Sequence, residues 1–269
     1  MLGLKGRVLK ICSFKVSEEY NGFRYGELLL KTIFNHAIVN RYDWIYITMF
    51  EKYGDLINLF EDFGFQNMNL KTEIGELIFS KPMSFSKKDH DSFDSLYFNV
   101  RYGPFALKIK GIPAYIVPIK PRYHRLLFPE LEKQLELQPG YHPFGNSIRK
   151  AYLSKALIRT ITPGSNIFFY RSADVHSVMS IGVVEDTLVS SSPTEIARYV
   201  GKRTVYTFSE IEKICQNEVL AILFRQSRIL GIPITLKELK ENGVLAAAPQ
   251  SIVTIPKEVL DWVQLRINE

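Results

Sequence analysis

The chain has 269 residues, of which 46% are hydrophobic and 23% charged, and its formal net charge is +6. This balance excludes wholesale disorder, and no apolar run approaches the roughly 20 residues that a membrane-spanning helix needs. Two distant cysteines, Cys12 and Cys215, exclude a disulfide scaffold and a CxxC metal site, and they favour a reducing cytoplasm.

The first segment alternates strand and helix patterns. Residues 7–16 alternate polar and apolar side chains as a strand does, and residues 25–39 carry apolar side chains at helical spacing. Residues 44–50 predict a buried strand, residues 55–63 a second helix, and residues 70–80 one or two more strands. This order predicts an α/β layer with a crossover connection.

Residues 84–95 are polar and serine-rich, and they predict a linker between a first domain, 1–83, and a second domain, 96–269. Short apolar runs bounded by proline or glycine predict strands of a compact barrel or strongly curved sheet in the second domain. They are residues 114–118, 167–171, 178–184, 219–224 and 252–255.

Helices interrupt these strands. Ser192 and Thr235 each begin a capping box that predicts a helix, and residues 256–267 predict a helix at the end of the chain. The expected fold class is therefore an α/β layer followed by an α+β domain with peripheral helices.

The loop between the first strand and the first helix is a candidate anion site, because unpaired amides and the positive end of the helix dipole point at it. A pyrophosphate fits such a site. The loop comprises Asn21, Gly22, Phe23, Arg24, Tyr25 and Gly26.

Residues 5–82, with the segments LKICSFKV, NGFRYGELLL and LINLFEDFGF, resemble the C-terminal half of the GNAT acetyltransferase fold. The resemblance implies an acyl-CoA-binding module in which the loop amides hold the pyrophosphate of acetyl-CoA. It also implies that the strand preceding the loop faces the pantetheine arm, at Phe14, Lys15 and Val16.

The sequence departs from this family in ways that leave the activity open. The N-terminal half of the fold is missing, Arg24 stands at a glycine position, and Phe60 stands where a tyrosine often acts as general acid. No catalytic residue is assigned. The alternatives are a cofactor-binding or assembly module, an N-acetyltransferase completed by a second copy or a partner chain, and a purely structural adaptor.

The whole positive excess lies in residues 84–269, where cations stand beside aromatic residues at 120–125, 147–152, 168–171 and 224–228. Such an asymmetry favours a polyanionic partner, and aromatic rings beside cations stack bases and bind phosphates. The five histidines are scattered, so no metal site is expected.

The run ITPGSNIFFYRSADVHSVMSIGVVEDT, within residues 140–255, resembles the PUA-like superfamily, whose relatives include ASCH and EVE domains. The resemblance implies a small β-pseudobarrel that presents a cleft to RNA or to a flipped, modified base. The expected nucleic-acid contacts are Asn146, Arg149, Lys150, Tyr170 and Arg171, together with Arg225 and Arg228 from the last cation–aromatic cluster.

Overall fold

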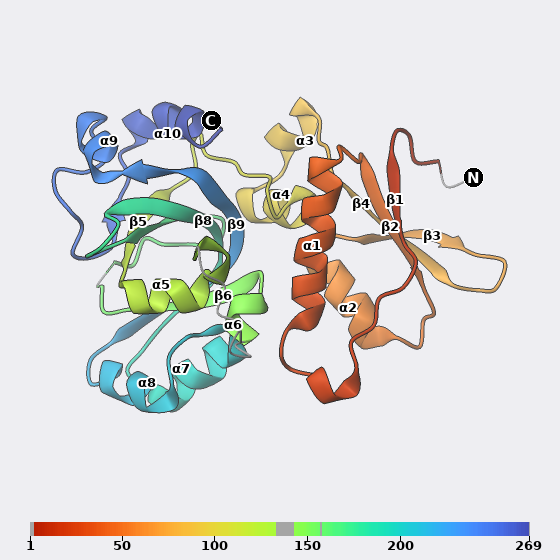
Figure 1. The fold of residues 1–269 in the computed structure, drawn as a ribbon, viewed down its shortest axis with the longest axis horizontal. Helices are drawn as coiled ribbons and strands as arrows, with labels where there is room; N and C mark the ends of the chain where they lie inside the picture. Colours follow the sequence, from red (N-terminus) through yellow and green to blue (C-terminus); the bar gives the residue numbers. More distant parts are fainter. Residues whose placement is uncertain (1–2, 133–142, 157, 269) are drawn as a thin grey trace. The chain divides into compact units, whose positions relative to one another are not determined.

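The computed structural model describes residues 3–132, 143–156 and 158–268, which form two compact units, each with its own sheet (Figure 1). The units are Met1–Leu107 and Lys108–Glu269, so the division falls later than the predicted linker at residues 84–95. The polar residues there are helix caps: Ser86 and Asp94 accept backbone N–H bonds at the starts of α3 (Lys87–Ser92) and α4 (Ser95–Tyr102). No helix of the described residues has the length and apolarity to cross a bilayer.

The first unit contains a four-stranded sheet of order β1-β2-β4-β3, and its strands and helices up to β4 alternate as the sequence predicts for residues 7–80. The two strands β1 and β2 are parallel, and the helix α1 connects them, whereas β4 is antiparallel to both β2 and β3. The elements are β1 (Val8–Ile11), η1 (Glu18–Tyr20), α1 (Tyr25–Val39), β2 (Trp44–Met49), α2 (Gly54–Asp62), β3 (Gln66–Lys71) and β4 (Leu77–Pro82).

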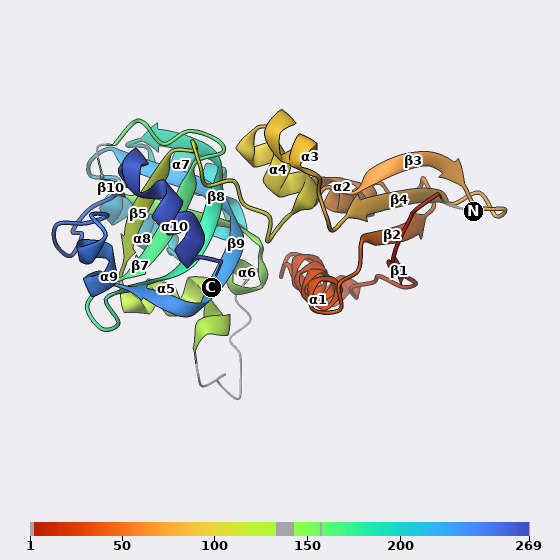
Figure 2. The same cartoon turned by 90° about the horizontal axis from the view of Figure 1, so that it is seen from above.

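Phenylalanines build the core of this unit, whose helices and strands are seen from a second direction in Figure 2. Phe34 of α1 is fully buried and stacks on Phe65, with ring centroids 6.3 Å apart. Phe60 of α2 is also fully buried and meets Phe65 edge-to-face at 4.8 Å. Lys81 is buried as well, and its ammonium group donates hydrogen bonds to the carbonyls of Val100 and Arg101, which ties β4 to α4.

The second unit is a six-stranded sheet of order β10-β5-β7-β8-β9-β6. Its strands are β5 (Ala114–Ile119), β6 (Arg149–Ser154), β7 (Asn166–Arg171), β8 (Ser177–Ser190), β9 (Val219–Thr235) and β10 (Val253–Thr254). Its helices are α5 (Pro121–Leu127), η2 (Pro129–Leu131), α6 (Pro143–Asn146), α7 (Pro193–Val200), η3 (Gly201–Arg203), α8 (Phe208–Ile214), α9 (Leu236–Glu241), η4 (Lys257–Val259) and α10 (Leu260–Arg266).

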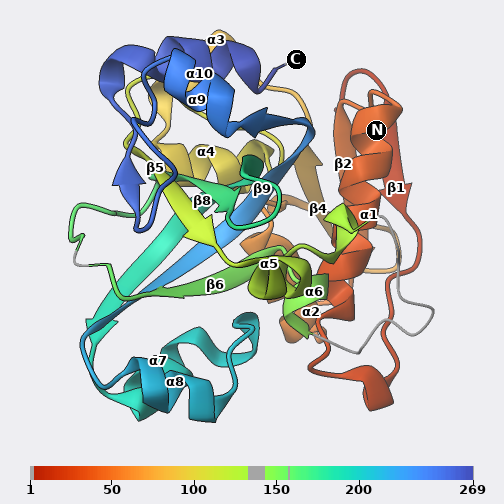
Figure 3. The same ribbon diagram turned by 60° about the vertical axis from the view of Figure 1, so that its left-hand side comes forward.

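This sheet is strongly curved, as expected (Figure 3). β5 and β6 stand four strand intervals apart, which is about 19 Å in a flat sheet. Nevertheless the hydroxyl of Tyr152 on β6 donates a 2.7 Å hydrogen bond to the carbonyl of Pro118 on β5. Register shifts between β8 and β9, the two longest strands, supply the bends that such curling requires.

Apolar side chains from opposite parts of the curved sheet meet in one interior cluster. It includes Val117 of β5, Phe169 of β7 and Phe224 of β9. Phe128, at the end of α5, packs on Phe169 with ring centroids 5.0 Å apart, so α5 covers this interior. The helix therefore holds a fixed position against the strands.

The two predicted capping boxes differ. Thr235 and Glu238 form both reciprocal bonds at the start of α9. Ser192 accepts the backbone N–H of Glu195 at the start of α7, but the Glu195 carboxylate accepts its hydrogen bond from Ser190 instead. The hydroxyl of Ser190 thus takes the place of the Ser192 backbone N–H as the donor to the Glu195 carboxylate.

Candidate nucleic-acid interface

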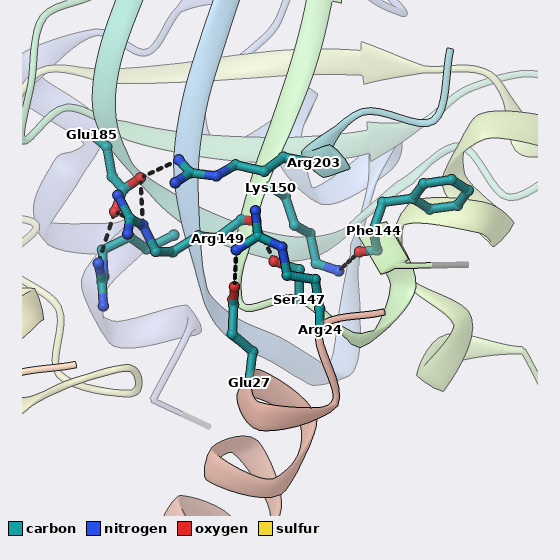
Figure 4. Close-up of polar contacts among 9 residues, drawn as sticks. Arg24, Glu27, Phe144, Ser147, Arg149, Lys150, Glu185 and Arg203 are labelled. Atoms are coloured by element: carbon teal, nitrogen blue, oxygen red, sulfur yellow. Dashed lines mark hydrogen bonds and ion pairs between the residues drawn. The ribbon is translucent and has the colours of Figure 1, made fainter. Parts of the chain in front are cut away.

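Two of the arginines expected to bind nucleic acid share one largely buried carboxylate, that of Glu185, which Figure 4 shows beside Arg149 and Arg203. Arg149 and Arg225 face each other across β6 and β9, and both pair with Glu185 of β8, at 2.8 and 2.7 Å. Arg203 joins them at 3.3 Å. Burial by itself raises the pKa of Glu185, but Arg225, Arg149 and Arg203 outweigh burial and hold that pKa below its usual value.

Lys150 and Arg171 anchor the segments that cover the interior of the sheet. Lys150 is 0% exposed, and its ammonium group donates to the carbonyl oxygens of Phe144, at 2.6 Å, and of Gly145 (Figure 4). Arg171 pairs with Glu132 and Asp174, both at 2.7 Å. The position of Lys150 does not support the predicted nucleic-acid contact, because a fully buried ammonium group bonded to carbonyls does not reach a ligand at the surface.

The remaining predicted contacts lie at other places. Arg228 donates to the carbonyl of Ile267 and to the side chain of Asn268, near the end of the chain. Asn146 is the last residue of α6. The arginines expected to bind nucleic acid thus make three different sets of internal contacts, and in each set an arginine bonds to a residue far along the chain.

Tyr170, by contrast, lines a pocket of about 680 Å³ in the second unit. We call this the tyrosine pocket, since four tyrosines contribute to it. Its lining residues are Pro118, Lys120, Tyr123, Tyr152, Leu153, Ser154, Lys155, Ala156, Tyr170, Ser172, Ala173, His176, Tyr206, Ile214, Ala248, Pro249, Gln250, Ser251 and Ile252. The pocket lies where β5 and β6 approach without pairing, next to the Tyr152–Pro118 hydrogen bond.

The four tyrosines are held by packing and hydrogen bonds. The rings of Tyr123 and Tyr206 stand 4.6 Å apart, and the hydroxyl of Tyr123 donates to Glu210 at 3.4 Å. The hydroxyl of Tyr170 lies 3.4 Å from Nδ1 of His176. Burial raises the pKa of all four phenols, so each hydroxyl is protonated at neutral pH.

The charge of the pocket is positive. Lys120 and Lys155 are exposed at its rim, at the ends of β5 and β6, and His176 stands beside Tyr170. None of the described lining residues is acidic. Within the same described residues, no group of histidine, cysteine and carboxylate side chains could hold a metal ion.

Part of this site lies in the sequence clusters that place cations beside aromatic residues. The clusters at 120–125, 147–152 and 168–171 contain Lys120, Tyr123, Tyr152 and Tyr170, all of which line the pocket. Alternation along a strand is the signal that separates them, because neighbouring residues such as Tyr170 and Arg171 point to opposite faces. Tyr206, Lys155 and residues 248–252 come from segments without any comparable signal.

In the loop expected to bind acyl-CoA, the backbone is left-handed at two residues and the charged side chain is already paired. Gly22 and Arg24 adopt left-handed backbone conformations, with φ of 85° and 60°, and no side chain caps α1. The guanidinium of Arg24 is paired with Glu27 at 2.9 Å, so its charge is already engaged (Figure 4). Phe14 packs edge-to-face on the buried Phe60, with ring centroids 5.0 Å apart. The expected strand over residues 7–16 is shorter than predicted: β1 ends at Ile11, so the expected pantetheine contacts Phe14, Lys15 and Val16 lie outside it, and Phe14 is half-buried.

Comparisons with known proteins concern the fold. No family model and no curated protein sequence matches this chain. Among solved structures, ASCH from Zymomonas mobilis is 15% identical, with 56% of this chain and 94% of that chain covered and a TM-score of 0.44. A serine-to-alanine variant of that protein is 16% identical, covering 57% and 99%, again with a TM-score of 0.44.

A protein from Leishmania major is 11% identical, with 60% of this chain and 98% of that chain covered and a TM-score of 0.37. The structural neighbours thus include ASCH proteins, at a weak overall likeness.

Proposed function

We propose that the second unit binds single-stranded RNA by taking one base into the tyrosine pocket, with the adjoining phosphates at Lys120 and Lys155. The observation that carries this proposal is the pocket itself: four neutral tyrosines, two exposed lysines at the rim and no acid in the described lining. Base stacking on an aromatic ring contributes about 1–3 kcal/mol, and lysines bind phosphate.

The size and location of the pocket support a base. Ligand pockets occupy roughly 300–1,000 Å³, and the volume of about 680 Å³ falls within that range. The rim lysines stand at the ends of two strands that do not pair with each other, so the opening between them faces a strand of nucleic acid from two sides. RNA recognition commonly uses unstacked bases of this kind.

The test is binding of a fluorescently labelled single-stranded RNA, measured by anisotropy at several salt concentrations. The double variant Lys120→Ala/Lys155→Ala should bind more weakly, and the slope of log K against log salt should become shallower by about 1.4, or 0.7 for each lost phosphate contact. Lys240→Ala/Lys257→Ala is the matched control, because it removes the same charge from exposed lysines outside the pocket lining.

Equal affinity and equal salt slope in the two double variants would overturn the proposal, since the loss would then report only net charge. The same RNA sequence as DNA, measured in parallel, shows whether the ribose hydroxyls contribute.

Acetyl-CoA binding by the first unit is a separate proposal. It is supported by the start of α1, where no side chain caps the helix, so that its first amides point into the loop. Calorimetry with acetyl-CoA tests it, with Gly26→Trp as the variant in the first turn of α1, where a Cβ would lie 3.0 Å from Leu59. Absence of heat with the wild-type chain would exclude it. Acetyl transfer has no assigned acid, because Phe60 is a buried phenyl group.

A further inference from the structure

The turn between β7 and β8 brings one histidine to the lining of the tyrosine pocket. Residues 172–176 form this turn, and Ser172, Ala173 and His176 belong to the lining. Ala173 and His176 adopt left-handed backbone conformations, with φ of 71° and 52°. A left-handed alanine is uncommon, and such conformations gather in segments that bind ligands.

Hydrogen bonds hold this turn at both ends. The backbone N–H of Ser172 donates to the carbonyl of Ile119 at 3.0 Å, directly before Lys120 in the sequence. The carbonyl of His176 accepts from the backbone N–H of Leu236 at 2.9 Å, at the start of α9. The turn is thereby tied to the end of β5, where Lys120 stands exposed at the rim.

His176 has one ring nitrogen available to a ligand. Its side chain is exposed, and Nδ1 lies 3.4 Å from the hydroxyl of Tyr170. Within the described residues, Nε2 makes no hydrogen bond or ion pair. In the neutral ring the Tyr170 hydroxyl donates to Nδ1, whereas in the protonated ring Nδ1–H donates to the hydroxyl oxygen. The contact with Tyr170 thus exists in both charge states, and Nε2–H is a donor in both.

We infer that His176 is a third cation of the tyrosine pocket, which contacts the RNA backbone and makes RNA affinity rise as the pH falls from about 8 to about 5.5. This inference rests on the proposed RNA binding and adds its pH dependence. A phosphate beside the ring favours the protonated form, so binding is coupled to proton uptake. The gain in affinity is therefore complete in mild acid and disappears as the pH rises.

The charged groups around the turn do not titrate in this range. A hydrogen bond from Arg171 holds the pKa of Asp174, in the same turn, below its usual value. In the first turn of α9, burial by itself raises the pKa of Glu238, but hydrogen bonds from a threonine and an arginine lower it to about 2. Burial raises the pKa of Tyr170 on β7 and lowers that of His124 on α5 to about 4.

The test is binding of short oligouridylate, measured by anisotropy at about pH 8 and about pH 5.5, because uracil has no group that titrates between them. Wild-type protein should bind about fivefold more tightly at the lower pH, with a salt slope steeper by about 0.7. His176→Asn removes the charge with a residue that accepts the left-handed backbone, and it should abolish the pH dependence. His176→Lys keeps a charge throughout, so its affinity at the higher pH should match that of wild type at the lower.

His36→Asn is the matched control, because His36 is exposed and lies outside the pocket lining, so the full pH dependence should persist. Equal wild-type affinity at the two pH values would overturn the inference, as would a pH dependence that survived in His176→Asn. If that binding still weakened in Lys120→Ala/Lys155→Ala, the proposed function would stand without His176. If oligouridylate bound at neither pH, the proposed function would fail, and this inference with it.

Discussion

Two groups of basic residues in the second unit differ in whether their charge is paired with a carboxylate or exposed to solvent. Arg149, Arg203 and Arg225 surround the carboxylate of Glu185, which is only 11% exposed. Lys120 and Lys155 stand exposed at the rim of a pocket without acids among its described lining. The first arrangement holds strands together, whereas the second leaves charge available to a ligand. A basic residue in the sequence therefore indicates binding of a polyanion only where the fold places no carboxylate beside it.

The largest expected effect is that of Glu185→Gln, which leaves the three arginines beside a neutral amide. Removing one member of a buried ion-pair group costs about 3 kcal/mol, so the free energy of unfolding in urea should fall by about that amount. RNA affinity of the folded protein should not change. Glu218→Gln is the control, because its pair with Arg159 is exposed and contributes about 0–1 kcal/mol.

The same variant carries a pH signature. Because the folded-state pKa of Glu185 lies below its usual value of 4.5, its stabilising contribution is complete above that pH and disappears as the pH falls through the folded pKa. The difference in stability between wild type and Glu185→Gln should therefore shrink in acid. A difference that stayed constant down to pH 2 would show that the carboxylate charge does not stabilise the fold.

The next effect in size concerns the pocket. Tyr123→Ala removes one wall and the ring that supports Tyr206, and it should weaken RNA binding by about 2 kcal/mol, or roughly 30-fold. Phe208→Ala is the control, since Phe208 is 51% exposed and does not belong to the lining. Equal losses in the two variants would indicate a diffuse aromatic surface instead of a pocket.

The smallest effect is expected at Arg171, next to Tyr170 in the sequence. Its partners Glu132 and Asp174 are 27% and 38% exposed, so Arg171→Met should lower the free energy of unfolding by about 1 kcal/mol. RNA affinity, measured under conditions where the variant is folded, should match wild type. A large loss of affinity with unchanged stability would return Arg171 to the nucleic-acid interface and blur the distinction between the two groups.

The sequence alone determined most of the elements. Residues 25–39 form α1 with the predicted bounds, and β2, β5 and β7 lie within a residue of the predicted runs. These elements are set by local periodicity, which a window of neighbouring residues contains. The long strands β8 and β9 were only partly predicted, because their outer halves lack a continuous apolar pattern.

Tertiary structure decided which charges are available and where the site lies. Glu185 stands 36 residues from Arg149 and 40 from Arg225, so no local pattern reveals that they pair. The tyrosine pocket likewise draws on segments from Pro118 to Ile252, which meet only because the sheet curls until Tyr152 reaches Pro118. Charge neutralisation and concavity depend on distances in space, whereas the sequence records only the order along the chain.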